Sequence, residues 1–338
     1  MSEPKLFYRT SFGSAYLGDS LKYVTQIEDE SVDLILTSPP FALKRKKEYG
    51  NADEDKYVDW FMSFATHLHR ILKPTGSFVL DLGGSYMPGF PVRSIYQFEL
   101  LVRLVRDAGF YLAQEFYHYN PARLPAPAEW VNVRRIRVKD SVNVVWWLSK
   151  SQAPKADNRQ VLRPYSDSMK SLLKKGYKPA LRPSGHDISD KFSKDNGGAI
   201  PPNLLELSNT DSNSSYQKMC RSHDIKVHPA RFPPAFAEFF IKFLTEEGDL
   251  IYDMFGGSNT TGYVAETLRR RWLVSELSRE YLEGSTFRFD PMILKRFNEP
   301  SSKREDKKNG RTIFKATATE PVASIHRQER LASVDFFR

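Results

Sequence analysis

The chain has 338 residues, of which 40% are hydrophobic and 13% aromatic, which is enough apolar material for a sizeable core. Lys and Arg number 50 against 41 Asp and Glu, so the formal charge is +9 and a polyanion is a suitable partner. Cys220 is the only cysteine, which excludes a disulfide framework and a cysteine-rich zinc site, and we expect no metal. No apolar run approaches the ~18–20 residues that cross a bilayer, and residues 1–10 lack the apolar centre of a signal peptide. We therefore expect no membrane contact and a cytoplasmic location.

Strands and helices are expected to alternate through the first half of the chain. Ser20 is expected to cap a short helix that reaches Ile27. Apolar residues at three- and four-residue spacing predict a helix over 54–72, stopped by Pro74 and Gly76, and a second over 94–108. The runs of strand length are 12–17, 32–37, 77–82, 110–119 and 142–148. Such alternation predicts βαβ units, a parallel sheet and an α/β fold.

The composition changes between residues 151 and 227, which are rich in Ser, Asn, Lys, Pro and Gly. A stretch of that length without periodicity is either disordered or a functional insertion held by the scaffold. The alternating pattern then resumes, with a helix at 233–244, a strand at 249–254, a helix at 263–270 and a strand at 272–276. The charged end of the chain is expected to be solvated.

A loop of small residues, Phe255–Gly262, follows the strand at 249–254. It turns directly into a helix, whose first backbone amides can then approach a ligand closely. Glu276 ends the next strand about 20 residues after Asp253, where a Rossmann-type unit holds ribose hydroxyls. The loop lacks the GxGxxG pattern of nicotinamide sites, and an ordinary strand–turn–helix connection is the alternative interpretation.

A proline turn, Thr37–Phe41, ends the buried strand at 32–37 and so lies at the edge where open α/β folds place their sites. Two prolines fix its backbone and remove two amide donors. Ser38 Oγ and a rigid carbonyl are then able to accept two hydrogen bonds from an exocyclic amino group, and Phe41 offers a face to a planar base. Taken alone, the motif is equally typical of a turn that merely ends a strand.

Together, TSPPF and FGGSNTT resemble the motifs of DNA methyltransferases that act on N4 of cytosine or N6 of adenine, in the β arrangement with the catalytic motif first. The segments TSPPFALKRKKEYGN, RPSGHDI and HPARFP are similar to the PvuII-type N4-cytosine enzymes, and the likeness runs from about residue 12 to 290. It implies a Rossmann-like S-adenosylmethionine-dependent methyltransferase fold with an inserted target-recognition region. The implied parts are a catalytic half (12–150), the target-recognition region (151–227), a cofactor-binding half (228–290) and a charged tail (291–338).

The resemblance also implies roles for individual residues. Asn259 stands where the family carries a glycine, and asparagine tolerates a left-handed backbone better than most residues. The implied catalytic residues are Ser38, Pro39, Pro40 and Phe41. The implied cofactor-binding residues are Asp19, Asp253, Phe255, Gly256, Gly257, Ser258, Asn259, Thr260 and Glu276.

A base inside duplex DNA cannot reach the proline turn, so the resemblance implies that the base is flipped out. Two basic clusters, one directly after the turn and one at 134–139, are placed to meet phosphates, although solvated surface charge is the alternative for both. His186 is as typical of a loop cap as of a base contact. The expected DNA-binding residues are Lys44, Arg45, Lys46, Lys47, Arg134, Arg135, Arg137, His186 and Lys194.

The sequence thus predicts an enzyme that methylates N4 of cytosine in double-stranded DNA, implied to act within CAGCTG and beside a cognate restriction endonuclease. N6-adenine methylation is the alternative, and serine at the first position of the turn favours cytosine. C5 methylation needs a thiolate, and Cys220 has no proline turn before it. Two other classes of protein are alternatives. A nicotinamide-dependent dehydrogenase would not use the SPPF turn, and a DNA-binding module without activity would not need the cofactor loop.

Overall fold

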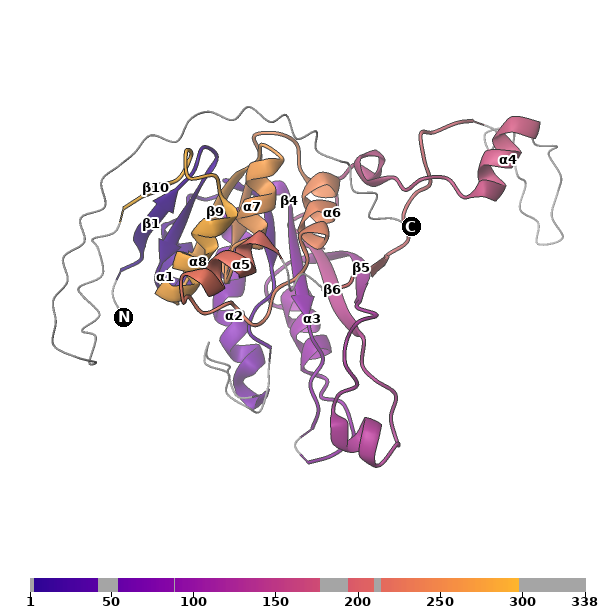
Figure 1. The fold of residues 1–338 in the computed structure, drawn as a ribbon, viewed down its shortest axis with the longest axis horizontal. Coiled ribbons are helices and arrows are strands. Elements are labelled where there is room, and N and C mark those ends of the chain that lie inside the picture. The colour runs from indigo at the N-terminus through magenta and orange to yellow at the C-terminus, as the bar shows by residue number, and fades with distance from the viewer. Residues whose placement is uncertain (1–2, 42–53, 88, 177–193, 210–213, 298–338) are drawn as a thin grey trace. The chain divides into compact units, whose positions relative to one another are not determined.

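The structure, a computed structural model, describes residues 3–41, 54–87, 89–176, 194–209 and 214–297 (Figure 1). The chain divides into two compact units, one of residues 1–162 and 199–297 and one of residues 163–198 and 298–338. In the second unit, Ser166 caps the helix α4 (Asp167–Lys175). No helix in the described ranges is long and apolar enough to span a membrane.

Ten strands of the first unit form one mixed sheet in the order β10-β1-β2-β9-β8-β3-β4-β6-β5-β7. The five central strands, β2 to β4 in that order, run parallel, whereas β1, β6 and β10 pair antiparallel with their neighbours. The strands are β1 Lys5–Arg9, β2 Gly13–Leu17, β3 Val32–Thr37, β4 Leu72–Leu82, β5 Tyr111–Tyr119, β6 Val142–Ser149, β7 Leu204–Glu206, β8 Leu250–Asp253, β9 Arg271–Glu276 and β10 Lys295–Arg296.

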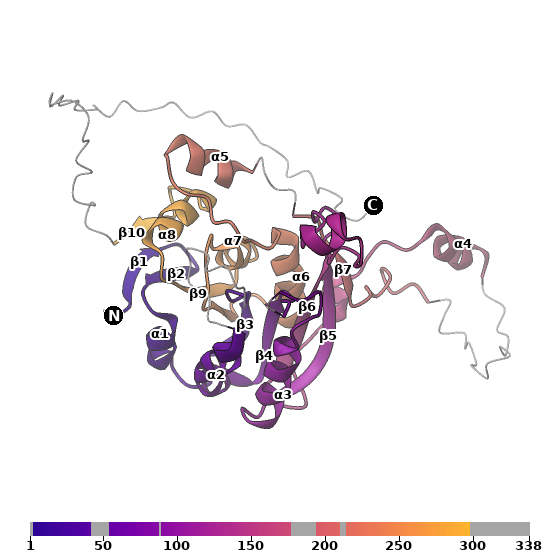
Figure 2. The same ribbon diagram turned by 90° about the horizontal axis from the view of Figure 1, so that it is seen from below.

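Helices cover both faces of this sheet (Figure 2). The helices α1 (Ser20–Gln26), α2 (Glu54–Ile71) and α3 (Tyr96–Arg106) pack on one face. On the other face lie α6 (Pro234–Leu244), α7 (Thr260–Thr267) and α8 (Arg279–Ser285), and α5 (Ser215–Ser222) packs against α8. The shorter turns are a π-helical one at Glu129–Val133 and 3-10 turns at Asn158–Val161 and Thr286–Arg288.

The strand β3 shows why the two faces form. All six of its residues are buried, and Leu34, Ile35 and Leu36 alternate between the two hydrophobic cores. Ile35 belongs to the core under α1, α2 and α3, whereas Leu34 and Leu36 belong to the core under α6 and α7. A strand with helices on both faces is expected to be largely apolar, and in β3 only Asp33 and Thr37, near its two ends, are polar.

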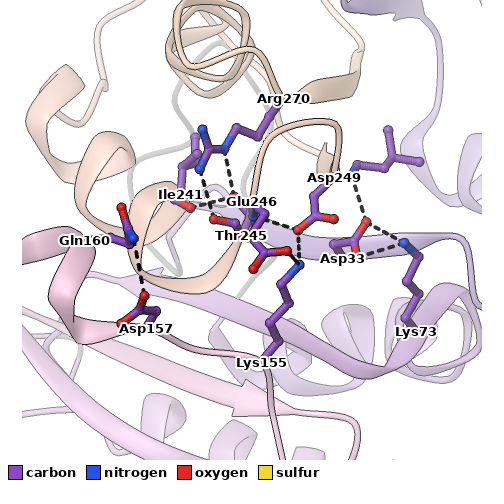
Figure 3. A network of polar contacts seen from close by, with 11 residues as sticks. Asp33, Lys73, Lys155, Asp157, Gln160, Ile241, Thr245, Glu246, Asp249 and Arg270 are labelled. Atoms are coloured by element: carbon purple, nitrogen blue, oxygen red, sulfur yellow. Dashed lines mark hydrogen bonds and ion pairs between the residues drawn. The ribbon is translucent and has the colours of Figure 1, made fainter.

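A polar network ties the amino ends of the central strands together, at the edge opposite the carboxyl ends (Figure 3). Asp33, at the start of β3, accepts hydrogen bonds from Lys73 Nζ at 2.8 Å and from the backbone N–H of Leu250 at 2.9 Å. Lys155 donates to Asp249 at 2.7 Å and pairs with Glu246 at 2.9 Å. These contacts give the charged groups of this edge their partners. The functional site is therefore to be sought at the other edge, where the strands have their carboxyl ends.

Several elements differ from those predicted. Asp19, not Ser20, caps α1, because the Asp19 carboxylate accepts the Leu21 N–H at 2.9 Å and Ser20 is the first helical residue. Pro74 and Gly76 lie within β4, where the pairing with β3 is irregular, rather than between a helix and a strand. The sheet is mixed, not purely parallel. The region 151–227 also contains regular elements that its polar composition concealed, namely α4, α5 and β7.

Candidate active site

The proline turn and the small-residue loop lie side by side because their strands are neighbours. β3 pairs in parallel with β8, so both strands end at the same edge of the sheet. The next strand after β3, β4, lies on one side of this pair, and the next strand after β8, β9, lies on the other side. Ligands of open α/β sheets bind at such a reversal of strand order. The Thr37 hydroxyl donates to Asp253 Oδ1 at 2.7 Å and joins the two strand ends directly.

A cavity of about 670 Å³ lies at this edge. Residues after β3, β8 and β9 line it, together with others from α2 and from β4, β5 and β6. Of the predicted catalytic and cofactor residues, all but Asn259 contribute to the lining. The structure therefore brings together two sets of residues that lie some two hundred positions apart in the sequence. The lining residues used below are Asp19, Ser38, Pro39, Phe41, Trp60, Phe64, Asp81, His118, Asn120, Arg123, Asn143, His228, Asp253, Phe255, Gly257 and Glu276.

Glu276 lies at the end of β9 with both carboxylate oxygens held. Its Oε2 accepts the Gly257 N–H at 2.7 Å and its Oε1 accepts the Ser278 N–H at 2.8 Å. Burial raises the pKa of Glu276, and the backbone N–H groups of Ser278 and Gly257 oppose that rise. The Leu277 N–H also bonds this carboxylate, which has about four lone-pair sites and is therefore able to accept from a ligand as well.

Asp253 holds the loop rather than opening toward a ligand. Its Oδ1 accepts from the Thr37 hydroxyl and from the Phe255 N–H at 3.1 Å, and its Oδ2 accepts from the Thr261 hydroxyl at 2.6 Å. Burial raises the pKa of this carboxyl, and the Thr261 and Thr37 hydroxyls oppose the rise. Asp253 and Asp19, the cap of α1, both line the cavity, and the carboxylate of Asp253 is also positioned to shape the loop.

Asn259 has the left-handed conformation that its sequence position predicts, with φ 51° and ψ 48°. Its Oδ1 accepts the Gly262 N–H at 2.8 Å and caps α7, and its Nδ2 donates to the Tyr8 hydroxyl at 2.8 Å. The side chain therefore fastens the loop to β1 instead of lining the cavity. This cap also explains why α7 begins at Thr260, earlier than predicted.

Replacing Asn259 by alanine is expected to lower the free energy of unfolding by about 2 kcal/mol, since a helix cap is worth ~1 kcal/mol and a left-handed alanine costs ~1 kcal/mol. Asn259→Gly removes the same side-chain contacts, but glycine adopts the left-handed backbone without strain. Its loss of unfolding free energy should therefore be smaller. Urea unfolding of the two variants measures the difference. Equal costs would mean that the left-handed backbone is of no energetic consequence here.

Aromatic side chains form one wall of the cavity. The Phe255 ring lies 5.7 Å from that of Trp60 and 5.6 Å from that of Phe64, both on α2. Such a wall gives a flat apolar surface beside the polar groups of Glu276 and Asp19, which suits a ligand with a planar ring and a sugar. The helical spacing of Trp60 and Phe64 predicts only that they face the core, and the fold shows that they also line the cavity.

On the side of β4, the Ser38 hydroxyl donates to Asp81, with its Oγ 3.3 Å from both Oδ2 and the backbone O of that residue. Phe41 packs its ring over Gly83, where a Cβ would lie only 2.4 Å from the ring. Burial raises the pKa of Asp81, and His118, Asn143 and Ser38 oppose the rise. A carboxyl of this kind beside a proline turn is a candidate proton acceptor.

His118 and Asn143 extend the polar wall beyond Asp81. They are direct cross-strand partners of β5 and β6. The Asn143 Oδ1 accepts from Arg123 at 3.0 Å. His118 is 7% exposed, its Nε2 lies 3.3 Å from the Leu207 carbonyl, and its Nδ1 has no hydrogen-bond partner among the described residues. Asp81, His118 and Asn143 could not be predicted from the sequence, because they lie inside strands and belong to no motif.

The predicted DNA-binding residues have different surroundings. Arg134 and Arg135 are exposed beyond the π-helical turn. The Arg137 guanidinium is held within the protein, where it donates to the Pro91 carbonyl at 2.6 Å and lies 4.8 Å from the centre of the Tyr86 ring. Lys194 is exposed in the second unit. Two predictions, the cluster 44–47 and His186, lie outside the described residues.

Comparison with known proteins identifies the family. A family model described as DNA methylase matches residues 32–287, which hold both loops and the strands from β3 to β9. The chain belongs to this DNA methylase family. It is 58% identical over 285 residues to the type II methyltransferase M.PvuII of Proteus hauseri, covering 83% of this chain and 85% of that protein.

Solved structures agree with this assignment. The PvuII DNA methyltransferase (cytosine-N4-specific) superposes with a TM-score of 0.68 at 50% identity and covers 83% of this chain and 87% of its own. A DNA modification methylase of Thermus thermophilus, solved with S-adenosyl-L-methionine, shares the fold with a TM-score of 0.51 at 18% identity, covering 82% and 93%. The expected α/β methyltransferase fold is thereby confirmed.

As a member of this family, the chain is an S-adenosylmethionine-dependent DNA methyltransferase. The cavity fits that cofactor in its volume, in its aromatic wall at Phe255 and Trp60, and in the buried acceptor Glu276. The loop backbone also comes close to the cavity at Gly257, whose φ is +50° and where a Cβ would meet the His228 ring at 3.0 Å. When bound, the cofactor supplies an electrophilic methyl group.

Proposed function

We propose that this enzyme methylates N4 of a cytosine that is flipped out of duplex DNA. The observation that carries the proposal is the hydrogen bond from the Ser38 hydroxyl to Asp81 in the wall of the cavity. Because the hydroxyl hydrogen is engaged with Asp81, the lone pairs of Ser38 Oγ are available to accept a hydrogen from an amino group. The Pro39 carbonyl is the second acceptor that we assign to the same amino group.

In the proposed reaction, Ser38 and Pro39 accept both N–H bonds of the cytosine amino group. This arrangement favours a pyramidal nitrogen and localises its lone pair, which otherwise conjugates with the ring. Phe41 orients the base, and placing the nitrogen in line with the methyl group supplies much of the rate. As the nitrogen–carbon bond forms and the sulfur–carbon bond breaks, the amino group becomes cationic. We assign its surplus proton to the Asp81 carboxylate, by way of the Ser38 hydroxyl.

Cysteine chemistry has no part in this proposal. Cys220 is fully buried in α5 and is not among the described residues that line the cavity. Burial raises the pKa of its thiol, which disfavours a thiolate. Direct transfer to an amino nitrogen, without a covalent enzyme intermediate, is the chemistry that the cavity supports. N6 of adenine is the alternative acceptor of the same turn.

The likeness to M.PvuII supports CAGCTG as the target sequence and a pairing with a cognate restriction endonuclease. Because the substrate is cellular DNA, we also propose a cytoplasmic location. We propose the division into a catalytic half (12–150), a target-recognition region (151–227), a cofactor-binding half (228–290) and a tail (291–338). Phosphate contacts are proposed for Lys44, Arg45, Lys46, Lys47, Arg134, Arg135 and Arg137, and contacts in the target-recognition region for His186 and Lys194.

Transfer of a labelled methyl group from S-adenosylmethionine to short duplexes tests this function. We expect label in a duplex that contains CAGCTG and in none whose central cytosine is replaced by thymine or whose flanking bases are permuted. Transfer to DNA without CAGCTG would refute the target sequence but not the reaction. No transfer to any duplex, from a protein that binds the cofactor, would refute the function.

A further inference from the structure

The loop between β5 and β6, residues 120–141, exposes large apolar side chains to solvent. Leu124 is 80% exposed and Val138 84% exposed, and Val133 and Ile136 are also exposed. Scattered apolar residues on a surface are ordinary, but several on one loop mark a site of interaction. Positive charges stand among them, at Arg134, Arg135 and Lys139, so the partner of this surface is expected to be anionic.

The loop is held firmly. Arg137 donates to the Pro91 carbonyl and stacks on Tyr86, and Arg93 pairs with Asp140 at 2.9 Å. Trp130, in the π-helical turn, packs edge-on against the same tyrosine at 5.1 Å. Since these contacts tie the loop to Tyr86, Pro91 and Arg93, its exposed apolar side chains are presented on a fixed frame and little conformational entropy is lost when they are covered.

Two of the exposed side chains belong to residues that are sequence neighbours of groups at the cavity. Leu124 directly follows Arg123, which lines the cavity and donates to Asn143. Lys139, the neighbour of Val138, donates from its Nζ to the carbonyls of Pro121 at 3.1 Å and Arg123 at 3.2 Å. These bonds join the two limbs of the loop at the rim of the cavity.

We propose that Leu124 and Val138 form an apolar wedge that enters the DNA duplex where the target base has left the stack. The inference rests on the proposed function, because only a flipped base leaves such a space beside the cavity. Apolar side chains that enter between base steps are a known means of stabilising deformed DNA, and Arg134 and Arg135 would bind the phosphates beside it.

The wedge would offset part of the free energy that base flipping costs. Moving a base out of the stack costs a few kcal/mol, and a flipped base leaves apolar faces of its neighbours exposed to water. Two rigid apolar side chains that cover those faces offset part of that cost. Their contribution should therefore be large for an intact base pair and small where the pair is already disrupted.

The test compares a matched duplex, in which the target cytosine of CAGCTG faces guanine, with one in which it faces an abasic site. Leu124→Ala combined with Val138→Ala is expected to weaken binding to the matched duplex, in the presence of S-adenosylmethionine, by about ten- to a hundredfold. On the abasic duplex the variant should bind within about threefold of wild type. Met292→Ala is the control, since Met292 is 92% exposed near β10, at the opposite edge of the sheet.

Equal losses on the two duplexes would overturn the wedge and leave Leu124 and Val138 as general contacts, and no loss on either would remove them from the interface. Binding is the readout, so the result does not depend on chemistry. Absence of methyl transfer by the wild-type protein would refute the proposed function, whereas the ratio of the two affinities decides the wedge. All of the substituted side chains are exposed, so thermal unfolding of the variants should match wild type.

Discussion

Replacing Asp81 by asparagine is expected to slow methyl transfer by about 10²–10⁴-fold, the usual contribution of a positioned acid or base. The Asp81 carboxylate is buried, accepts from the Ser38 hydroxyl and is the group to which we assign the surplus proton of the amino group. Asparagine keeps an acceptor but cannot be protonated. Single-turnover transfer at saturating DNA and cofactor isolates this step, and affinity for both ligands should be unchanged.

The rate of methyl transfer should depend on pH through the ionisation of the Asp81 carboxyl. Burial raises the pKa of Asp81, so the wild-type rate should fall as the pH drops through a value above the ordinary range of an aspartate. A raised pKa in the folded state also means that ionised Asp81 destabilises the fold, and stability is lost as the pH rises through that pKa. Asp81→Asn should therefore unfold at a higher temperature than wild type at neutral pH.

The control for this substitution is Asp290→Asn, because Asp290 is exposed and accepts only a local N–H, that of Met292, in the described structure. Neither its rate nor its unfolding temperature should move appreciably. A fully active Asp81→Asn variant would remove Asp81 from the reaction. A variant that is inactive and also less stable would show that the side chain holds the strand ends together instead.

Replacing Glu276 by alanine is expected to weaken S-adenosylmethionine binding by roughly 1–3 kcal/mol, through lost and unpaired hydrogen bonds. The structure adds a second cause to the lost ligand contact, since the same carboxylate accepts the N–H groups of Gly257 and Ser278. Titration calorimetry with the cofactor measures the loss. DNA affinity without cofactor should remain near wild type.

Glu276→Gln separates the two causes. Glutamine offers one carbonyl oxygen and turns an NH₂ group toward a backbone N–H, so it should weaken binding by less than alanine does. If Glu276→Ala lost DNA and cofactor affinity together, with a lower unfolding temperature, the residue would be a part of the fold and not a cofactor ligand.

The site could be predicted from the sequence where its residues follow strands in short motifs. The run Val32–Thr37 is largely apolar, so it predicts a central strand, and the turn that follows must then lie at the carboxyl edge. The same reasoning applies to Asp253 and to the loop after it. Asn259 is the sharpest case, because its left-handed conformation follows from its place in the motif and is confirmed.

The other half of the cavity could not be predicted, because it depends on how distant strands pair. His118 and Asn143 face each other only because β5 and β6 are antiparallel, and Asp81 reaches them through the antiparallel pair of β4 and β6. Nothing near these residues in the sequence distinguishes them. The contacts of the Arg137 guanidinium with Pro91 and Tyr86 could not be predicted either, since they too depend on the fold.

The most direct measurement of the central claim is mass-spectrometric nucleoside analysis of plasmid DNA from cells that express this protein, compared with cells that express Ser38→Ala. We predict N4-methylcytosine in the first sample and none in the second, with Cys220→Ser giving as much as wild type. N6-methyladenine would keep direct transfer to an amino group and change the base. The appearance of 5-methylcytosine, or a loss of methylation with Cys220→Ser, would contradict the mechanism.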